Sequence, residues 1–259
     1  MGAESNGRVV WHDCMTSDID TSVDFYTKLF GWTIKDIEMG GPGPYRMIHV
    51  GDASIGGFVQ LEDGAPVGAQ WVAYVACDDA DAACKRAESG GGKIAIPPMD
   101  IPNVGKFAVI QDPQGAFIAP YQSATGDVGP EIEGHSPVGH FIWEEMLAKD
   151  PAAAAAYYGE LFSWKTSEMD MGEMGTYRIQ MRGETPEAGI MGMPPDADGP
   201  PMWLSYVHVE DVDASTTRLK ELGGKTLVEP MSIPNVGRMS VNCDPTGVMI
   251  ALYRPEPME

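Results

Sequence analysis

Two identical five-residue stretches decide the fold of this chain. The first reads Ile101-Pro102-Asn103-Val104-Gly105, and the second reads Ile233-Pro234-Asn235-Val236-Gly237, 132 residues further along. The same offset relates three pairs of tryptophans, namely Trp11 and Trp143, Trp32 and Trp164, and Trp71 and Trp203. An offset that holds throughout without an insertion indicates two copies of one folding unit, because a solenoid would repeat at about 20–50 residues.

The repeat divides the 259-residue chain into two predicted domains, residues 8–123 and residues 137–255. Each is long enough to build its own hydrophobic core. The segment between them, residues 124–136, is small, polar and aperiodic, so we expect a linker there. Residues shared by both copies are expected to maintain the fold, whereas residues found in one copy only are candidates for specialised chemistry.

The chain is strongly acidic. Its 38 acidic and 17 basic residues give a formal net charge of −21, and its isoelectric point is near 4.4. Such a surface repels phosphate backbones and anionic membranes, so we expect neither a nucleic-acid partner nor a membrane partner. The acidic residues are spread along the chain, which is typical of a protein kept in solution by its charge.

The sequence predicts a cytoplasmic protein. It contains no apolar stretch of the about 18–20 residues that span a bilayer, and residues 1–8 lack the apolar core of a signal peptide. The four cysteines have neither CxxC spacing nor counterparts in the other copy; they are Cys14, Cys77, Cys84 and Cys243. We therefore expect free thiols in a reducing compartment.

Hydrophobic spacing predicts the same order of elements throughout. A strand over residues 9–15 precedes a helix over residues 19–30, which begins after Asp18 and ends at Gly31. Three strands follow, over residues 32–35, 45–50 and 54–59. The same order of elements then repeats, with a strand, a helix and three strands over residues 71–77, 79–89, 93–96, 105–111 and 117–121. Because the second copy agrees, the chain is predicted to contain four βαβββ units, which is an α+β fold.

Each copy also carries an ordered set of short motifs. The first copy has Asp18, Phe25-Tyr26, Leu29-Phe30-Gly31-Trp32, Asp79-Ala80-Asp81 and Asp112-Pro113-Gln114-Gly115. The second has Tyr157-Tyr158, Leu161-Phe162-Ser163-Trp164, Asp211-Val212-Asp213-Ala214 and Asp244-Pro245-Thr246-Gly247. This set resembles the vicinal oxygen chelate superfamily of glyoxalases, bleomycin-resistance proteins and extradiol dioxygenases. The resemblance covers nearly the whole chain and implies two tandem glyoxalase-like domains, each an incomplete barrel.

The resemblance also implies where a divalent metal would bind. In this superfamily the metal lies in the barrel cleft, is held by His, Gln or Glu, and chelates oxygens of the substrate. The corresponding positions are Trp11, Val72 and Ala119 in the first copy, and Trp143, Leu204 and Ala251 in the second. None of these six side chains is a useful metal ligand. We therefore predict that the usual metal is absent and that no cofactor is bound.

A shift of one residue in the first strand of each copy would change that prediction. It would replace Trp11 and Trp143 by His12 and Glu144, although the final strand would still supply no ligand. An unusual metal site therefore stays open as an alternative, built from His12, Asp13, Glu144, Glu145 and His208. Because no histidine recurs at its duplicated position, each is interpreted first as a surface or core residue.

With the unshifted register, alternation along the strands turns one set of side chains toward the clefts. The predicted ligand-binding residues are Trp11, Asp13, Tyr74 and Tyr121 in the first copy, and Trp143, Glu145, Tyr206, His208 and Tyr253 in the second. Such a lining suits a flat apolar molecule with one or two polar groups, although the same aromatics could simply fill the core. Asp13 and Glu145 are also candidate general bases.

Three functions remain open from the sequence. The first is binding of a small aromatic or heterocyclic ligand without a metal, by a monomer or a homodimer. The second is a metal-dependent lyase, isomerase or dioxygenase of the same superfamily with unusual ligands. The third is a signalling or protein-interaction role with vestigial clefts. No phosphate-binding glycine motif and no GxSxG nucleophile motif is present, so the sequence leaves open whether the protein is an enzyme.

Overall fold

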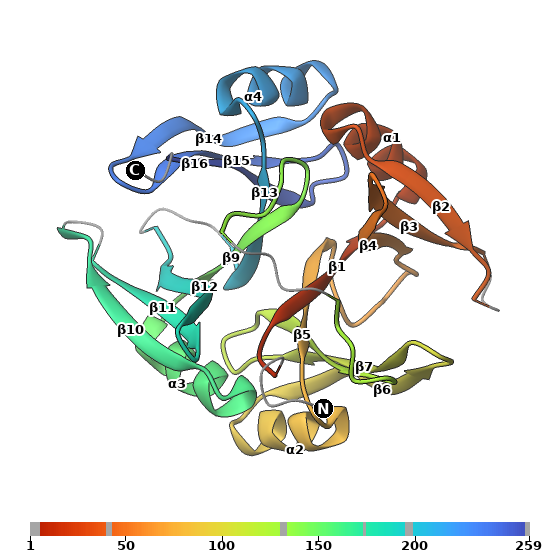
Figure 1. The fold of residues 1–259 in the computed structure, drawn as a ribbon, viewed down its shortest axis with the longest axis vertical. Helices are drawn as coiled ribbons and strands as arrows, with labels where there is room; N and C mark the ends of the chain where they lie inside the picture. The colour runs from red at the N-terminus through yellow and green to blue at the C-terminus, as the bar shows by residue number, and fades with distance from the viewer. Residues whose placement is uncertain (1–5, 40–42, 130–133, 173–174, 195–198, 257–259) are drawn as a thin grey trace. The chain divides into compact units, whose positions relative to one another are not determined.

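The computed structural model describes residues 6–39, 43–129, 134–172, 175–194 and 199–256. Within these residues four βαβββ modules follow one another, two in each repeat (Figure 1). This confirms the α+β class and the four predicted units. The predicted linker, residues 124–136, lies partly outside the described residues, as do residues 1–5 of the polar N-terminal stretch.

The modules have the same element order. The first consists of β1 (Val9–Thr16), α1 (Ile19–Phe30), β2 (Thr33–Ile37), β3 (Tyr45–Val50) and β4 (Ala53–Gln60). The second consists of β5 (Gln70–Ala76), α2 (Ala80–Ser89), β6 (Lys93–Ile101), β7 (Gly105–Gln111) and β8 (Phe117–Ser123). The third consists of β9 (Phe141–Ala148), α3 (Pro151–Phe162), β10 (Lys165–Asp170), β11 (Thr176–Arg182) and β12 (Thr185–Gly192). The fourth consists of β13 (Met202–His208), α4 (Val212–Glu221), β14 (Lys225–Ile233), β15 (Gly237–Cys243) and β16 (Met249–Pro255).

Each repeat forms one eight-stranded mixed sheet. The strand order is β2-β3-β4-β1-β5-β8-β7-β6 in the first repeat and β10-β11-β12-β9-β13-β16-β15-β14 in the second. In every module the first strand pairs with the last in parallel, and the three strands after the helix pair antiparallel. Each module is thus a sheet segment with its helix as the crossover.

The four helices begin in the same way, because an aspartate precedes each of them. The Asp18, Asp79, Asp150 and Asp211 carboxylates accept hydrogen bonds from the backbone N–H three residues on, at 2.9–3.1 Å. These bonds satisfy N–H groups that the first helical turn leaves open. The predicted end of α1 is also confirmed, since Gly31 adopts the left-handed conformation with φ 70°.

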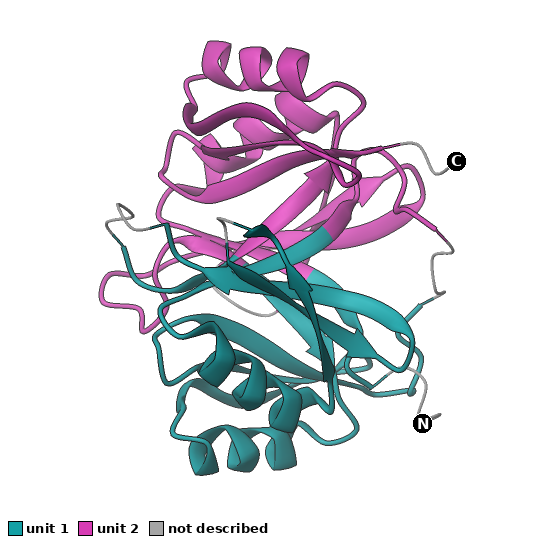
Figure 2. Cartoon of the chain, turned by 90° about the vertical axis from the view of Figure 1, so that its left-hand side faces the viewer, with its two compact units in different colours: residues 1–11, 72–130, 143–203 teal, residues 12–71, 131–142, 204–259 magenta. Residues whose placement is uncertain are grey.

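Two compact units are defined by the contacts between residues, and neither follows a single repeat (Figure 2). Unit 1 comprises residues 1–11, 72–130 and 143–203, and therefore combines the second and third modules. Unit 2 comprises residues 12–71, 131–142 and 204–259, and combines the first and fourth modules. The boundaries 8–123 and 137–255 remain sequence-based predictions of the repeats, whereas the hydrophobic cores are shared between them.

The core of unit 1 is organised around a chain of hydrogen bonds. Trp203 Nε1 donates to Tyr158 Oη (2.9 Å), and Tyr158 Oη donates to Asp112 Oδ2 (2.9 Å). Asp112 begins the turn between β7 and β8, and its other oxygen accepts from three backbone N–H groups of that turn at 2.7–2.9 Å. The Asp112 carboxylate is only 4 % exposed, and it accepts these four hydrogen bonds in place of water. It joins the turn of one module to the helix of another.

In unit 2 a different residue donates the side-chain hydrogen bond to the equivalent aspartate. Trp71 Nε1 donates to Tyr26 Oη (3.1 Å), as in unit 1, but here Ser22 Oγ donates to Asp244 Oδ2 (3.0 Å). Ser22 corresponds to Ala154 in the other repeat, which has no hydroxyl. The two cores therefore hold equivalent aspartates through donors from different positions of the helix.

Among the described residues the longest helices, α1 and α3, have 12 residues each, and none has the length and hydropathy of a membrane-spanning helix. All four cysteines are free thiols. Burial raises the pKa of the Cys77 thiol to about 12 and that of Cys84 to about 11, and it also raises the pKa of Cys14 and Cys243.

Thiol titration tests this burial. Because the thiolate is the reactive form, and almost none is present at pH 8 when the pKa is 11 or above, we expect slow reaction of native Cys14, Cys77 and Cys84 with an aromatic disulfide reagent. In denaturant all four thiols should react quickly. Fast reaction of more than one thiol in the native protein would contradict the burial described above.

Candidate functional site

A tyrosine and a carboxylate form a hydrogen-bonded pair in the first repeat. Asp13 lies on β1 and Tyr45 at the start of β3, and Tyr45 Oη donates to Asp13 Oδ1 at 2.6 Å. Between them on β4, Gly57 is the register partner of Asp13. A Cβ atom at Gly57 would overlap with the Tyr45 hydroxyl, so the glycine leaves the space that the phenol occupies.

The second repeat contains the equivalent pair. Tyr177 Oη on β11 donates to Glu145 Oε2 on β9 at 3.0 Å, and Gly189 on β12 is the register partner of Glu145. A Cβ atom at Gly189 would again overlap with the tyrosine hydroxyl. Trp143 Nε1 also donates to Tyr177 Oη, at 2.8 Å. We call these two arrangements, Tyr45–Asp13 and Tyr177–Glu145, the phenol–carboxylate pairs.

Each phenol–carboxylate pair brings two hydrogen-bonding groups together on neighbouring strands of one sheet. The hydrogen bond from phenol to carboxylate fixes both groups, and it is short in the Tyr45–Asp13 pair (2.6 Å) and longer in the Tyr177–Glu145 pair (3.0 Å). A phenol oxygen can accept as well as donate, as that of Tyr177 does from Trp143, and a carboxylate has two oxygens that accept. Such a pair can accept hydrogen bonds from a ligand hydroxyl or N–H, or take a proton from it. Sequence reasoning found Asp13 and Glu145 but missed their tyrosines.

An aromatic row lies on the face of unit 1 opposite α2. Phe107 on β7 is the register partner of both Tyr121 on β8 and Met99 on β6, and the Tyr74 and Phe107 rings are 5.5 Å apart. The alternate residues of β7, such as Ile110, pack with α2 in the core. Tyr74 is 5 % exposed and Tyr121 is half-buried. The structure therefore brings the predicted residues Tyr74 and Tyr121 onto one face.

Unit 2 has the matching row, opposite α4. Tyr206 on β13 and Tyr253 on β16 are 6.1 Å apart and edge to face, and Met239 on β15 is the register partner of Tyr253. The Tyr206 side chain is 5 % exposed, as Tyr74 is. Met239 stands where the first repeat has Phe107, so the row in unit 2 contains fewer aromatic rings.

The duplicated Ile-Pro-Asn-Val-Gly stretches are the turns β6–β7 and β14–β15, and each is tied to its aromatic row. Tyr121 Oη donates to the Val104 carbonyl at 2.9 Å, and Tyr253 Oη donates to the Val236 carbonyl at 2.8 Å. Asn103 and Asn235 adopt left-handed backbone conformations, with φ 62° and 61°. The hydroxyls of Tyr121 and Tyr253 thus hold the two turns in place.

His208 distinguishes the second repeat from the first. It is the last residue of β13, pairs in register with Tyr253, and is partly exposed. Its Nδ1 lies 2.6 Å from the carbonyl oxygen of Ser136. The first repeat has Ala76 at this position, so only unit 2 carries an imidazole beside its aromatic row.

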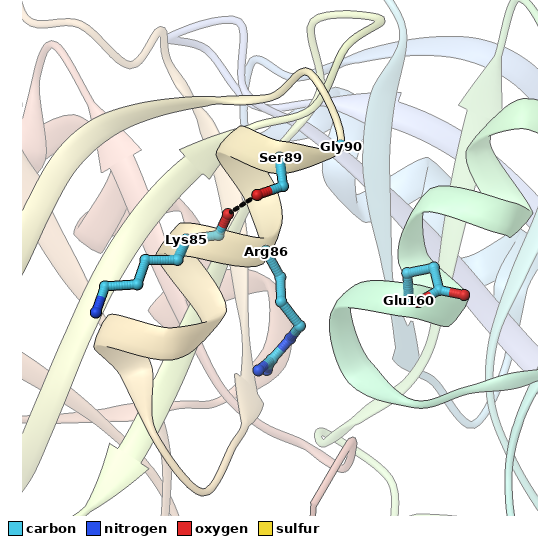
Figure 3. Close-up of a pocket in the computed structure, with 5 residues that line it drawn as sticks. All are labelled: Lys85, Arg86, Ser89, Gly90 and Glu160. Atoms are coloured by element: carbon cyan, nitrogen blue, oxygen red, sulfur yellow. Dashed lines mark hydrogen bonds between the residues drawn. The ribbon is translucent and has the colours of Figure 1, made fainter.

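A surface hollow of about 380 Å³ lies between α2 and α3, away from these residues. Figure 3 shows that the side chains of Lys85 and Glu160 point away from each other, and that the Ser89 hydroxyl donates to the Lys85 carbonyl at 2.8 Å. Arg86 donates to the Leu161 carbonyl near the end of α3, at 3.2 and 3.3 Å. Arg86 therefore links α2 to the end of α3, whereas the Ser89 bond lies within α2.

Comparison with known proteins identifies the family. The model of the Glyoxalase/Bleomycin resistance protein/Dioxygenase superfamily matches residues 8–119 and 138–252, one match in each repeat. The chain belongs to this superfamily. The recognition made from the short motifs is thereby confirmed, including the tandem arrangement.

Relatives in the superfamily match along almost their full length. "Putative glyoxylase CFP32" of Mycobacterium tuberculosis is 33% identical over 252 residues, which are 96% of this chain and 95% of that protein. "Anthracycline biosynthesis protein DnrV" of Streptomyces peucetius is 31% identical over 255 residues, 93% of this chain and 90% of that protein. The likeness therefore covers both repeats in each case.

Two solved structures of the superfamily share the fold. The Mn(II)-bound glyoxalase of Novosphingobium aromaticivorans aligns with a TM-score of 0.65 at 15% identity, covering 96% of this chain and 82% of that one. The 2,3-dioxygenase LapB of Pseudomonas sp. KL28 aligns with a TM-score of 0.66 at 11% identity, covering 98% and 94%. At these identities the likeness shows the fold alone.

The superfamily's metal does not fit the residues at its usual positions. In the first repeat these positions hold Trp11, Val72 and Ala119, and in the second they hold Trp143, Leu204 and Ala251. An indole, a branched alkyl group and a methyl group provide no donor atom that coordinates a divalent ion. The superfamily's usual metal site therefore has no ligands among these six side chains.

The alternative metal ligands are buried. His12 is 6 % exposed, and its ring stacks on Phe141 with the ring centres 3.7 Å apart and an angle of 15° between the planes. Glu144 is 3 % exposed. In the part of the chain that the structure describes, no three His, Cys, Asp or Glu side chains are grouped so that they could hold a metal ion.

Proposed function

We propose that this protein binds a small aromatic or heterocyclic compound, without the divalent metal of its superfamily, on the sheet faces that carry the phenol–carboxylate pairs and the aromatic rows. One observation carries the proposal. The first strand of each repeat has a tryptophan where the superfamily has a metal ligand, and in both repeats the carboxylate two residues further on accepts a hydrogen bond from a tyrosine that occupies the space left by a glycine.

The chemistry of these side chains fits a flat ligand with oxygen substituents. Aromatic rings bury a large area against a planar molecule, and a few polar groups fix its orientation. The name of DnrV connects that relative with the biosynthesis of anthracyclines. Anthracyclines are polycyclic compounds that carry hydroxyl and carbonyl groups, so a ligand of this general kind is a reasonable first probe.

A second function is favoured by the burial of His12 and Glu144. Both side chains are at most 6 % exposed, and both follow the tryptophan that replaces the usual first-strand ligand. A metal-dependent lyase, isomerase or dioxygenase would need such nitrogen and oxygen donors. In either case Asp13 and Glu145 are the candidate general bases, because each carboxylate already accepts a hydrogen bond from a phenol.

Binding of 1,2-dihydroxyanthraquinone tests the leading proposal. We expect this compound to raise the unfolding temperature of the chelator-free protein, since a ligand of the native state stabilises it by mass action. Replacing Tyr45 or Tyr177 by phenylalanine should weaken binding to that repeat by about tenfold, because a charge-assisted hydrogen bond contributes about 1.5–3 kcal/mol. Isothermal titration calorimetry gives both affinities.

Tyr157→Phe is the matched control. The Tyr157 hydroxyl is buried without a hydrogen-bond partner, so its removal should change neither the affinity nor the fold. Elemental analysis of the purified protein completes the experiment. Stoichiometric Mn, Fe, Ni or Zn that is lost in His12→Ala or Glu144→Gln, with no effect of Tyr45→Phe on ligand affinity, would establish the second function in place of the first.

A further inference from the structure

We infer that His208 is a proton acceptor for the ligand in the second repeat, and that this ligand carries an acidic hydroxyl group of the phenol or enol type. The inference rests on the proposed function and adds to it a residue and a substrate class. It starts from a difference between the repeats, because position 208 is histidine where position 76 is alanine.

The hydrogen bond of His208 fixes which ring nitrogen carries the proton. Its Nδ1 is 2.6 Å from the carbonyl oxygen of Ser136, and a carbonyl can only accept. Nδ1 is therefore the protonated nitrogen, and in the neutral ring Nε2 carries the lone pair. An imidazole oriented in this way by an acceptor behind it is the arrangement that general bases use.

The position of His208 places this acceptor next to the aromatic row of unit 2. His208 is the register partner of Tyr253 on β16, and Tyr206 precedes it by two residues on the same face of β13. The hydroxyl of Tyr253 already donates to the Val236 carbonyl. A planar ligand packed on the Tyr253 ring would therefore meet the imidazole of His208 at its edge.

The chemistry of the group indicates the class of hydroxyl. A neutral imidazole takes protons from acidic hydroxyls such as those of hydroxyquinones and enols far more readily than from aliphatic alcohols, because the acidic hydroxyls leave the more stable anions. The O–H bond of the ligand breaks, its proton bonds to Nε2, and the electron pair stays on oxygen. The products are a phenolate and an imidazolium whose Nδ1–H still donates to Ser136. The first repeat cannot perform this step with Ala76.

A comparison of two probes tests the inference. Wild-type protein should bind 1,2-dihydroxyanthraquinone about tenfold more tightly in the second repeat than anthraquinone, which lacks the hydroxyls, and bound dihydroxyanthraquinone should show the red-shifted visible absorption of its anion. His208→Ala, which introduces the residue of the first repeat, should abolish both effects and leave the affinity for anthraquinone unchanged. His208→Gln keeps a neutral acceptor and should retain part of the selectivity without the red shift.

Two controls separate the possible failures. His135→Ala alters an exposed histidine and should change neither affinity nor absorption, and the unfolding temperature of each variant reports whether it folds. Nitrogen-15 NMR of the neutral protein should show His208 protonated at Nδ1. Binding of both probes with selectivity and red shift intact in His208→Ala would refute the inference while the proposed function stands. Binding of neither probe would refute both.

Discussion

Replacing Asp112 by alanine is expected to lower the free energy of unfolding by about 3–5 kcal/mol, because it removes one partner of a buried, charged hydrogen-bond network. The change would leave the Tyr158 hydroxyl and three backbone N–H groups of the β7–β8 turn without their acceptor. Since Tyr158 belongs to α3, the loss should loosen both modules of unit 1. Urea denaturation followed by circular dichroism measures the effect.

The two compact units provide the control for this prediction. Tyr158→Phe should lower the free energy of unfolding by about 1–2 kcal/mol more than Tyr26→Phe does. The Tyr158 hydroxyl donates to Asp112, whereas in unit 2 the equivalent aspartate, Asp244, accepts from Ser22 instead. Ser22→Ala should accordingly destabilise unit 2. Equal effects of the two tyrosine variants would show that the hydrogen bond to Asp112 contributes nothing.

Substitutions at two adjacent glycines on β4 are expected to have different main effects, one on ligand affinity and the other on stability. In Gly57→Ala the new methyl group meets the end of the Tyr45 side chain, which can swing aside. We expect a stability loss of only about 1 kcal/mol, but a 10–100-fold loss of ligand affinity in the first repeat, because the phenol leaves Asp13. Calorimetric titration with 1,2-dihydroxyanthraquinone measures it.

Gly56→Ala is the contrasting variant. Its methyl group would meet the His12 carbonyl of the neighbouring strand, and a backbone cannot swing aside. We expect about 2–3 kcal/mol of destabilisation, at the upper end of overpacking effects.

The second repeat offers a further measurement in Gly189→Ala, which displaces Tyr177 from Glu145 as Gly57→Ala displaces Tyr45 from Asp13. If Gly57→Ala bound the probe as tightly as the wild type, the phenol–carboxylate pair would have no part in recognition.

Much of the fold was accessible from the sequence because its signals are local. Asp18, the apolar face and Gly31 fixed the limits of α1 to the residue. The predicted strand over residues 93–96 was too short, since β6 continues to Ile101 through Pro97 and Pro98. β6 is the edge strand of its sheet and has a hydrogen-bonded neighbour on one side only. A proline, which has no N–H group, can therefore lie in β6 without breaking hydrogen bonds to a second neighbour.

Only part of the candidate site could be predicted from the sequence, because some of its contacts are not local. Strand alternation identified Asp13 and Glu145, but their tyrosines lie 32 residues away on strands that touch them only across a glycine. A signal did exist, since Tyr45 and Gly57 both recur at the repeat distance as Tyr177 and Gly189. The pairing of modules was not accessible, because a repeat distance says nothing about which helix packs on which.

The interleaved modules also have a consequence for the order in which the newly made chain can fold. The buried face of α1 packs against residues of the fourth module, such as Val207 and Leu219. During synthesis residues 12–71 therefore leave the ribosome well before residues 204–259, their packing partners, exist. Residues 72–203, by contrast, hold nearly all of unit 1. The first module is thus synthesised first but packs last. The apolar face of its helix stays accessible to chaperones and proteases until the fourth module has been synthesised.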